Sequence, residues 1–354
     1  MRSDSETAIR LLLPVAPKHP EIFLRAARTN RPVSSWRPAR KFRGIVFRPI
    51  PTVPAFYLRF VNSAVSVAAP GAGRRLWRRA LDAVLFSSVW LAGAAAAQTA
   101  ASFRRWPAAN GGVNGRVVAL VFAATLFVYN LDAVLPFKHR QPAAGSGRKA
   151  WQQRHRRILA VLAGAAALAA GYLFLADDWW RYLPALLPLT LLALVYSWPL
   201  VRWQGQRRAL REVPLLKGFL IAGVWSAITV GLPALAQHRP LAEVLELLAQ
   251  RFCLVLAITI VFDIRDLSRD RAAGTHTFPV VLGVAGARVV ALASLAGAML
   301  LGFERGAPPL GLVLMGLAAA AVILLAEERR SDYFFALLAD GVLLVPAVLY
   351  LVGK

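Results

Sequence analysis

Three aspartates in the segment 263–270 have the spacing of a metal or phosphate site. Asp263, Asp266 and Asp270 stand at positions i, i+3 and i+7, so a helix that continued through them would project all three from one face. Three carboxylates crowded together repel one another unless a cation lies between them. Hard divalent cations prefer carboxylate oxygens, and Mg²⁺ binds one or two carboxylates together with substrate phosphates. Three arginines interleave with the aspartates and could neutralise such phosphates: Arg265, Arg269 and Arg271.

The composition indicates that this acidic run belongs to a membrane protein. The chain has 354 residues, of which 58% are apolar and 17% charged, whereas soluble proteins are roughly 45–50% apolar and 25% charged. The net charge of +24 lies in short clusters between apolar stretches, which is typical of membrane orientation and argues against nucleic-acid binding. The single cysteine, Cys253, excludes a disulfide framework and a cysteine-based zinc site.

Apolar stretches of spanning length recur along the chain after residue 79. Each is close to the roughly 20 residues that cross a bilayer, and only a helix satisfies its own backbone hydrogen bonds there. We therefore predict an all-α membrane protein, a bundle of about nine transmembrane helices. The predicted spans are 80–103, 113–135, 158–176, 183–201, 215–236, 244–262, 287–303, 310–326 and 333–352.

The connecting segments predict the orientation of the bundle. Arg and Lys are frequent before the first predicted span and then in every second connection, and they are sparse in the connections between. By the positive-inside rule, the N-terminus is cytoplasmic and the acidic run faces the cytoplasm. We expect an integral protein of a bacterial cytoplasmic (inner) membrane whose active face is cytoplasmic.

Residues 1–75 differ from the transmembrane domain predicted for 76–354. They are rich in Arg and Pro, and their apolar stretches are too short to span a bilayer. The order basic, apolar, small that is expected of a cleavable signal is absent. We expect a poorly ordered basic arm that lies on anionic lipid. A start codon assigned too far upstream is the alternative.

The acidic run also has a plainer interpretation, as a solvated cytoplasmic loop whose Asp and Arg side chains pair with one another. Two features favour a functional role. The carboxylates begin at the end of a membrane helix, where ionisable groups are costly and usually functional. The following Gly274, Pro279 and Gly283 predict an ordered turn.

The segment DIRDLSRDRAAGTHTFPVVLG, which begins at Asp263, resembles the second aspartate-rich motif of the UbiA-type intramembrane prenyltransferases. The shared pattern is Asp-x-x-Asp-x-x-x-Asp-Arg-x-x-Gly-x-x-Thr-x-Pro, followed by Leu-Gly. Tyr196, in the sequence Tyr-Ser-Trp-Pro, is similar to the family's Tyr-Ser-x-Pro element, and Lys217 also fits the family. The resemblance covers roughly residues 80–354.

This resemblance implies a reaction and a set of partners. Family members bind an isoprenyl diphosphate through Mg²⁺, which two acidic motifs hold at the cytoplasmic ends of the second and sixth helices. Diphosphate leaves and an allylic carbocation forms. A lipophilic acceptor then attacks this cation; it is often an aromatic ring and sometimes a porphyrin or a sugar phosphate. Metal ions stabilise the charge on the leaving oxygen, and a dry apolar cavity protects the cation from water.

The first acidic motif departs from the family pattern Asn-Asp-x-x-Asp-x-x-x-Asp. Asn130 is in place, but Asp132 is the one carboxylate that follows it. Lys138 and Arg140 could contact diphosphate directly. Either the metal is held mainly by Asp263, Asp266 and Asp270, or the chain has lost activity. Asn130 and Asp132 could also be a polar pair that bonds between helices.

Two functions therefore remain open. The first is Mg²⁺-dependent transfer of an isoprenyl group from a prenyl diphosphate to an aromatic or other lipophilic acceptor. The second is a catalytically impaired UbiA-like membrane protein with a binding or transport role. For the enzyme, we expect diphosphate ligands at Asn130, Asp132, Lys138, Arg140, Tyr196, Lys217, Arg265 and Arg271, and metal ligands at Asp132, Asp263, Asp266 and Asp270. Asp340, within the last predicted span, is a further functional candidate.

Overall fold

Long apolar helices dominate the structure, a computed structural model. It describes residues 72–106, 112–135, 146–195, 201–203, 206–208, 213, 215–304, 309–345 and 347–348. Within these residues, five helices are long and apolar enough to cross a membrane, and a sixth span is obtained if one bent pair is counted as one. The all-α membrane class that the sequence predicts is confirmed.

The first span is bent at a pair of serines. Helix α3 (Ala72–Phe86) and helix α4 (Val89–Arg105) meet at an angle of 56°. Ser88 at the break has a φ of 64°, a left-handed conformation that interrupts the helix. Because α3 begins at Ala72, it starts four residues inside the segment 1–75 that the sequence sets apart as an arm. The rest of that arm lies outside the described residues.

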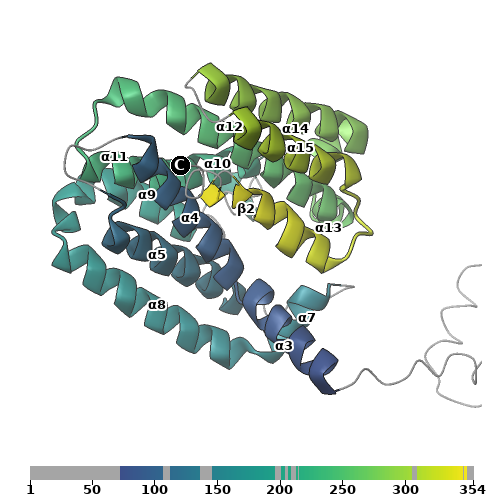
Figure 1. The fold of residues 1–354 in the computed structure, drawn as a ribbon. Coiled ribbons are helices and arrows are strands. Elements are labelled where there is room, and N and C mark those ends of the chain that lie inside the picture. Colours follow the sequence, from purple (N-terminus) through teal and green to yellow (C-terminus); the bar gives the residue numbers. More distant parts are fainter. Residues whose placement is uncertain are drawn as a thin grey trace, which may run out of the picture. The chain divides into compact units, whose positions relative to one another are not determined.

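Helices α5 (Gly115–Val134) and α8 (Arg156–Ala176) lie side by side (Figure 1). Asn114 begins α5 by accepting hydrogen bonds from the Arg116 and Val117 amides at 3.0 and 3.3 Å, as Asn does at helix N-termini. The short helix α7 (Gly147–Arg154) precedes α8 and packs on α3 and α5. This arrangement brings α7 beside the end of α5, where the first acidic motif lies.

A short hairpin follows the next apolar helix. The chain passes through the 3-10 turn η2 (Trp179–Tyr182) into α9 (Leu183–Val195). Strands β1 (Val201–Trp203) and β2 (Gln206–Arg208) then pair in antiparallel register, with Arg202 opposite Arg207. Within the predicted span 183–201, residues 183–195 form helix α9 and Val201 begins the hairpin. The sequence did not indicate this hairpin.

The remaining helices surround the acidic run. Helix α12 (Leu241–Arg265) has 61% of its apolar window buried, against 17% for α8, so α12 is the central helix. It packs on α10 and α14, and α14 packs on α15 (Figure 1). The other elements are α10 (Leu216–Ser226), the π-helical turn η4 (Ala227–Gly231), α11 (Leu232–Ala236), α13 (Leu267–Ala272), α14 (Phe278–Glu304), α15 (Pro309–Leu325), the π-helical turn η5 (Phe334–Ala339) and α16 (Asp340–Val342).

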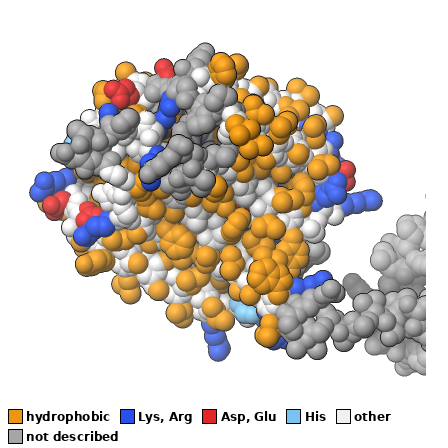
Figure 2. Space-filling model, viewed as in Figure 1, with side chains coloured by type: hydrophobic (Ala, Val, Ile, Leu, Met, Phe, Trp, Pro, Cys, Tyr) orange, Lys and Arg blue, Asp and Glu red, His pale blue; other side chains and the backbone are white. Residues whose placement is uncertain are grey.

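The outside of the bundle is apolar. Figure 2 shows hydrophobic side chains over much of the visible face, with Lys and Arg mainly toward its margins. One face of α8 contributes exposed Val161, Leu168, Tyr172 and Leu175. Large apolar side chains at helical spacing on an outer face are suited to lipid contact. The chain is thus an integral membrane protein, while the count of nine spans and the cytoplasmic N-terminus stay predictions.

Candidate functional site

The three aspartates of the acidic run are all buried, but they do not all lie on one helix. Helix α12 contains Asp263 and ends at Arg265, Asp266 stands at the break, and α13 contains Asp270. Their exposed fractions are 2%, 8% and 7%. The run is therefore not a solvated loop, although the pairing of Asp with Arg that the plainer interpretation also expects is present at Asp266.

Lys217 joins two of these carboxylates. Its ammonium nitrogen lies 2.7 Å from Asp263 Oδ1 and 3.5 Å from Asp270 Oδ2. Lys217 reaches them from the first turn of α10. The neighbouring Gly218 lets α10 approach α12 closely, because a Cβ at that position would lie 3.3 Å from the side chain of Leu256.

Arginines hold the third carboxylate. Arg265 donates from Nε and Nη2 to the two oxygens of Asp266 at 3.0 and 3.1 Å, and Arg269 pairs with the same carboxylate. Burial alone would raise the pKa of Asp266, but these guanidinium groups lower it to about 2, so the carboxylate is ionised at neutral pH. The Arg265 guanidinium also lies over the rings of Phe262 and Phe335, at 4.9 and 5.5 Å from their centres.

The turn after α13 is ordered, as the Gly and Pro pattern predicts. Thr275 donates its backbone N–H to the Asp270 carbonyl at 2.9 Å, and Gly274 adopts a φ of 67°. The Leu215 N–H donates to the carbonyl of His276 at 2.8 Å, which ties this turn to the start of α10. Burial raises the pKa of Asp270 although Lys217 opposes the shift. The turn thus fixes Asp270 relative to Lys217.

Asn130 stabilises the bend in the first span. Its side-chain amide donates to the Ser87 carbonyl at 2.9 Å and to the Leu126 carbonyl at 2.8 Å. The Ser87 bond links α5 to the α3–α4 break, which agrees with the interhelical alternative for this residue. Asp132 is half-buried one turn from the end of α5. Arg156 caps that end by donating to the Val134 carbonyl at 3.1 and 3.3 Å.

Arg148 is a site residue that the sequence did not single out. It lies on α7, and its Nη2 donates to Ser88 Oγ at 3.5 Å. Its guanidinium is in electrostatic range of Tyr129, Arg265 and Asp340. In the sequence it stands among other basic residues of one connecting segment, so no spacing distinguishes it.

One comparison with known proteins finds a solved structure with a similar fold. A solved structure described as the apo structure of a UbiA homolog from Aeropyrum pernix K1 superposes with a TM-score of 0.52. It is 21% identical, and the match covers 75% of this chain and 97% of that one. The chain has a UbiA-type fold. No protein-family model matches the sequence, and no curated protein matches it either.

The structure does not describe several of the residues that the sequence predicts as diphosphate ligands. Lys138, Arg140 and Tyr196 lie outside the described residues. Arg271 is described and exposed on α13. The structure therefore brings together Asp263, Asp266, Asp270, Lys217 and Arg265. The ligand roles of these and of the other predicted residues stay predictions.

Two carboxylates beside Lys217 are ligands of the kind that Mg²⁺ binds. Among the described residues, no three His, Cys, Asp or Glu side chains form a group that could hold a metal alone. Mg²⁺, however, binds through one or two carboxylates and completes its shell with phosphate and water. Asp263 and Asp270 both face the Lys217 ammonium, whose 3.5 Å distance to the buried Asp270 Oδ2 is longer than an ordinary hydrogen bond. Such an oxygen suits a hard cation.

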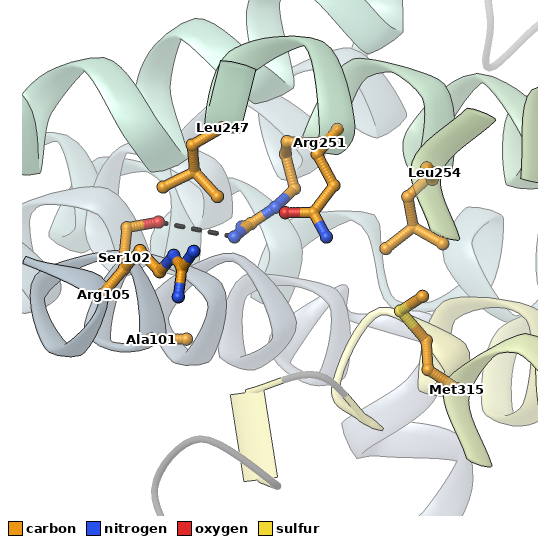
Figure 3. A pocket seen from close by; sticks show the side chains of 9 residues that line it. Ala101, Ser102, Arg105, Leu247, Arg251, Leu254 and Met315 are labelled. Atoms are coloured by element: carbon orange, nitrogen blue, oxygen red, sulfur yellow. Dashed lines mark hydrogen bonds between the residues drawn. The ribbon is translucent and has the colours of Figure 1, made fainter. Parts of the chain in front are cut away.

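A separate hollow lies away from the acidic run in the UbiA-type bundle (Figure 3). The residues that line it include Ser102, Arg105, Leu247, Arg251 and Met315. Arg251 is buried on α12 and donates to Ser102 Oγ and Thr229 Oγ1, at 3.4 Å in each case. It precedes Asp263 by three helical turns or more, about 18 Å along α12. The hollow is therefore not part of the acidic site.

Proposed function

We propose that this chain transfers an isoprenyl group from a prenyl diphosphate to a lipophilic acceptor within the membrane, in a Mg²⁺-dependent reaction. The single observation that carries the proposal is the buried convergence of Asp263 and Asp270 on Lys217. Buried carboxylates at the end of a membrane helix are costly unless they bind a ligand or a cation. The UbiA-type fold supports the same reaction.

The roles of the residues follow from their chemistry. Asp263 and Asp270 would hold the metal, with Asp266 and Asp132 as further candidates for metal binding. When bound, Mg²⁺ would stabilise negative charge on the leaving diphosphate. Lys217 is placed to neutralise a phosphate oxygen beside the carboxylates, and Arg265 to donate hydrogen bonds to another. The apolar bundle would exclude water from the allylic cation.

The bonds and charges of the proposed reaction balance without a redox partner. The C–O bond to diphosphate breaks and its electron pair leaves with diphosphate. A new bond forms between the allylic carbon and a nucleophilic atom of the acceptor, which then loses its proton to water or to a nearby base. The acceptor therefore needs only a nucleophilic centre and a lipophilic body that can reach the site through the membrane.

The test is release of diphosphate by the full chain in lipid nanodiscs. Farnesyl and geranylgeranyl diphosphate are supplied with Mg²⁺ or with EDTA, together with candidate aromatic acceptors. We expect release that requires Mg²⁺ and that Asp263→Asn abolishes. Asp178→Asn is the matched control, because Asp178 is exposed beside η2, away from the acidic cluster, and pairs there with Arg181.

A binding or transport role is the second candidate. The observation that favours it is the use of the Asn130 amide for structural hydrogen bonds, in a motif with one following carboxylate. It predicts that prenyl diphosphate binds with Mg²⁺ but that no diphosphate is released with any acceptor. Absence of prenyl diphosphate binding in the presence of Mg²⁺ would exclude the enzymatic proposal.

A further inference from the structure

One guanidinium group, that of Arg148, lies beside the serine pair to which Asn130 of the first acidic motif is bonded, and a second, that of Arg265, is in electrostatic range of it. Arg148 comes from α7, which packs on α3 and α5. Arg265 comes from the last turn of α12, and each is in electrostatic range of the other. Tyr129 and Asp340 are in range of Arg148 as well. Arg148 therefore brings positive charge close to Asn130, in the motif that lacks the further carboxylates of the family pattern.

The position of Arg148 is fixed through the backbone of α7. The Asp332 carboxylate accepts the Arg148 backbone N–H at 2.9 Å and lies 3.4 Å from the Ser146 hydroxyl. A carboxylate at a helix N-terminus is stabilised by the helix dipole and by the exposed N–H groups. Because Asp332 is engaged in this way, it holds α7 in place and leaves the guanidinium of Arg148 directed to Ser88.

Arg265 is fixed by different contacts. It forms two hydrogen bonds with Asp266, and its guanidinium lies against the rings of Phe262 and Phe335. Phe335 belongs to the π-helical turn η5, and Asp340 follows at the end of that turn. π-Helical turns inside α-helices are frequent at functional sites. The turn thus brings both an aromatic ring and a buried carboxylate to the two arginines.

The charges of this cluster favour an anion. Burial lowers the pKa of Arg148, and the nearby charge of Arg265 lowers it further. Asp340, which is 6% exposed, is near both arginines and compensates part of their charge. Guanidinium groups bind phosphate oxygens through pairs of parallel hydrogen bonds, which neither an ammonium group nor a hydrated metal reproduces. A phosphate group would relieve the repulsion between Arg148 and Arg265.

We infer that Arg148 and Arg265 bind phosphate oxygens of the prenyl diphosphate directly, so that the α5 half of the site works without a second metal ion. This inference rests on the proposed function and specifies how the incomplete motif supports it. Asp332 positions α7, and with it Arg148, through the Arg148 backbone N–H. One Mg²⁺ ion, on the side of Asp263 and Asp270, then completes the site.

The first experiment measures binding of farnesyl thiodiphosphate, a slowly reacting analogue, by calorimetry. The full chain is held in phosphatidylcholine nanodiscs with EDTA, so that no metal contributes. We expect Arg148→Met to weaken metal-free binding about tenfold or more, because charge-assisted hydrogen bonds are lost. Arg148→Lys should recover part of the affinity, since it keeps the charge and loses the planar geometry. Arg154→Met, at an exposed position of the same helix, should change nothing.

The second experiment counts metal ions. Mn²⁺ replaces Mg²⁺, and electron paramagnetic resonance measures bound ions per chain with farnesyl thiodiphosphate present. We expect one ion, which Asp263→Asn removes and which both Arg148→Met and the control Arg154→Met retain. Two bound ions per chain would overturn the inference, and so would equal metal-free affinity in Arg148→Met and the unaltered chain.

Two further arms separate the possible failures. If farnesyl thiodiphosphate does not bind even with Mg²⁺, the proposed function fails together with the inference. If farnesyl thiodiphosphate binds with Mg²⁺ but its binding does not depend on Arg148, the inference fails and the proposed function stands. Nanodiscs of phosphatidylglycerol test whether a lipid headgroup takes the guanidinium pair. If phosphatidylglycerol leaves the affinity for farnesyl thiodiphosphate unchanged, the inference is supported. If phosphatidylglycerol lowers this affinity in the unaltered chain but not in Arg148→Met, the inference is overturned.

Discussion

Replacement of Lys217 by Met should destabilise the metal-free protein strongly. The ammonium lies 2.7 Å from Asp263 Oδ1 and 3.5 Å from Asp270 Oδ2, and the side-chain exposed fractions are 17%, 3% and 10%. At an effective dielectric constant of about 20, the shorter contact alone is worth about 6 kcal/mol of Coulomb attraction. Desolvation offsets part of this attraction, and removal of one partner from a buried pair costs about 3–5 kcal/mol. We therefore expect the free energy of unfolding to fall by about 3–5 kcal/mol.

The assay is unfolding by titration with sodium dodecyl sulfate in mixed micelles, with EDTA present. Arg181→Met is the matched control, because Arg181 and Asp178 form an exposed pair at 3.5 Å, and such pairs contribute about 0–1 kcal/mol. Addition of Mg²⁺ should restore part of the stability of Lys217→Met, since a divalent cation can take the place of the ammonium between the two carboxylates. A loss no larger than that of the control would refute the ion-pair reasoning. Failure of Mg²⁺ to restore any stability would refute the proposed fit of the metal.

Three smaller changes test the surroundings of the site. Asn130→Ala removes two buried hydrogen bonds and should lower the free energy of unfolding by about 1–3 kcal/mol; an unchanged detergent titration would contradict the structural role. Gly274→Ala meets no neighbouring atom within 4 Å but is strained at a φ of +67°, so we expect a loss of about 1–2 kcal/mol, and a gain in stability would be inconsistent with that backbone conformation. Because the folded-state pKa of Asp266 is lowered to about 2, its stabilising contribution is present above its ordinary pKa near 4 and is lost as the pH falls toward 2. Acid titration of Asp266→Asn should lack this loss, and a profile equal to that of the unaltered chain would disprove the pairing with Arg265.

The sequence predicted the apolar helices well because their signal is local. The predicted spans 113–135, 158–176, 244–262, 287–303 and 310–326 each coincide with one described helix for most of their length. The span 80–103 coincides with the bent pair α3 and α4. The prediction of one continuous helical face was incomplete, because the helix breaks at Asp266 and resumes as α13. The break depends on contacts of Asp266 with two arginines and on the turn at Gly274, and no periodicity encodes these contacts.

Other parts of the site depend on contacts between distant residues. The hydrogen bond from Asn130 to Ser87 joins residues 43 positions apart and stabilises the bend in the first span. A pair of serines within an apolar stretch does not by itself predict such a bend. Arg148 reaches the site because Asp332, 184 positions later, holds the backbone of α7. The π-helical turns η4 and η5 likewise follow from packing rather than from composition. Sequence reasoning therefore found the carboxylates and Lys217 but missed the arginine on α7.

The central claim is that the buried aspartates and Lys217 form a Mg²⁺-dependent prenyl diphosphate site. The most direct measurement is equilibrium binding of geranylgeranyl diphosphate to the full chain in phosphatidylcholine nanodiscs, with Mg²⁺ and with EDTA. Binding should strengthen when Mg²⁺ is added, and Asp263→Asn should abolish this gain while Asp178→Asn preserves it. Absence of binding with Mg²⁺, or an equal gain in Asp263→Asn, would contradict the claim.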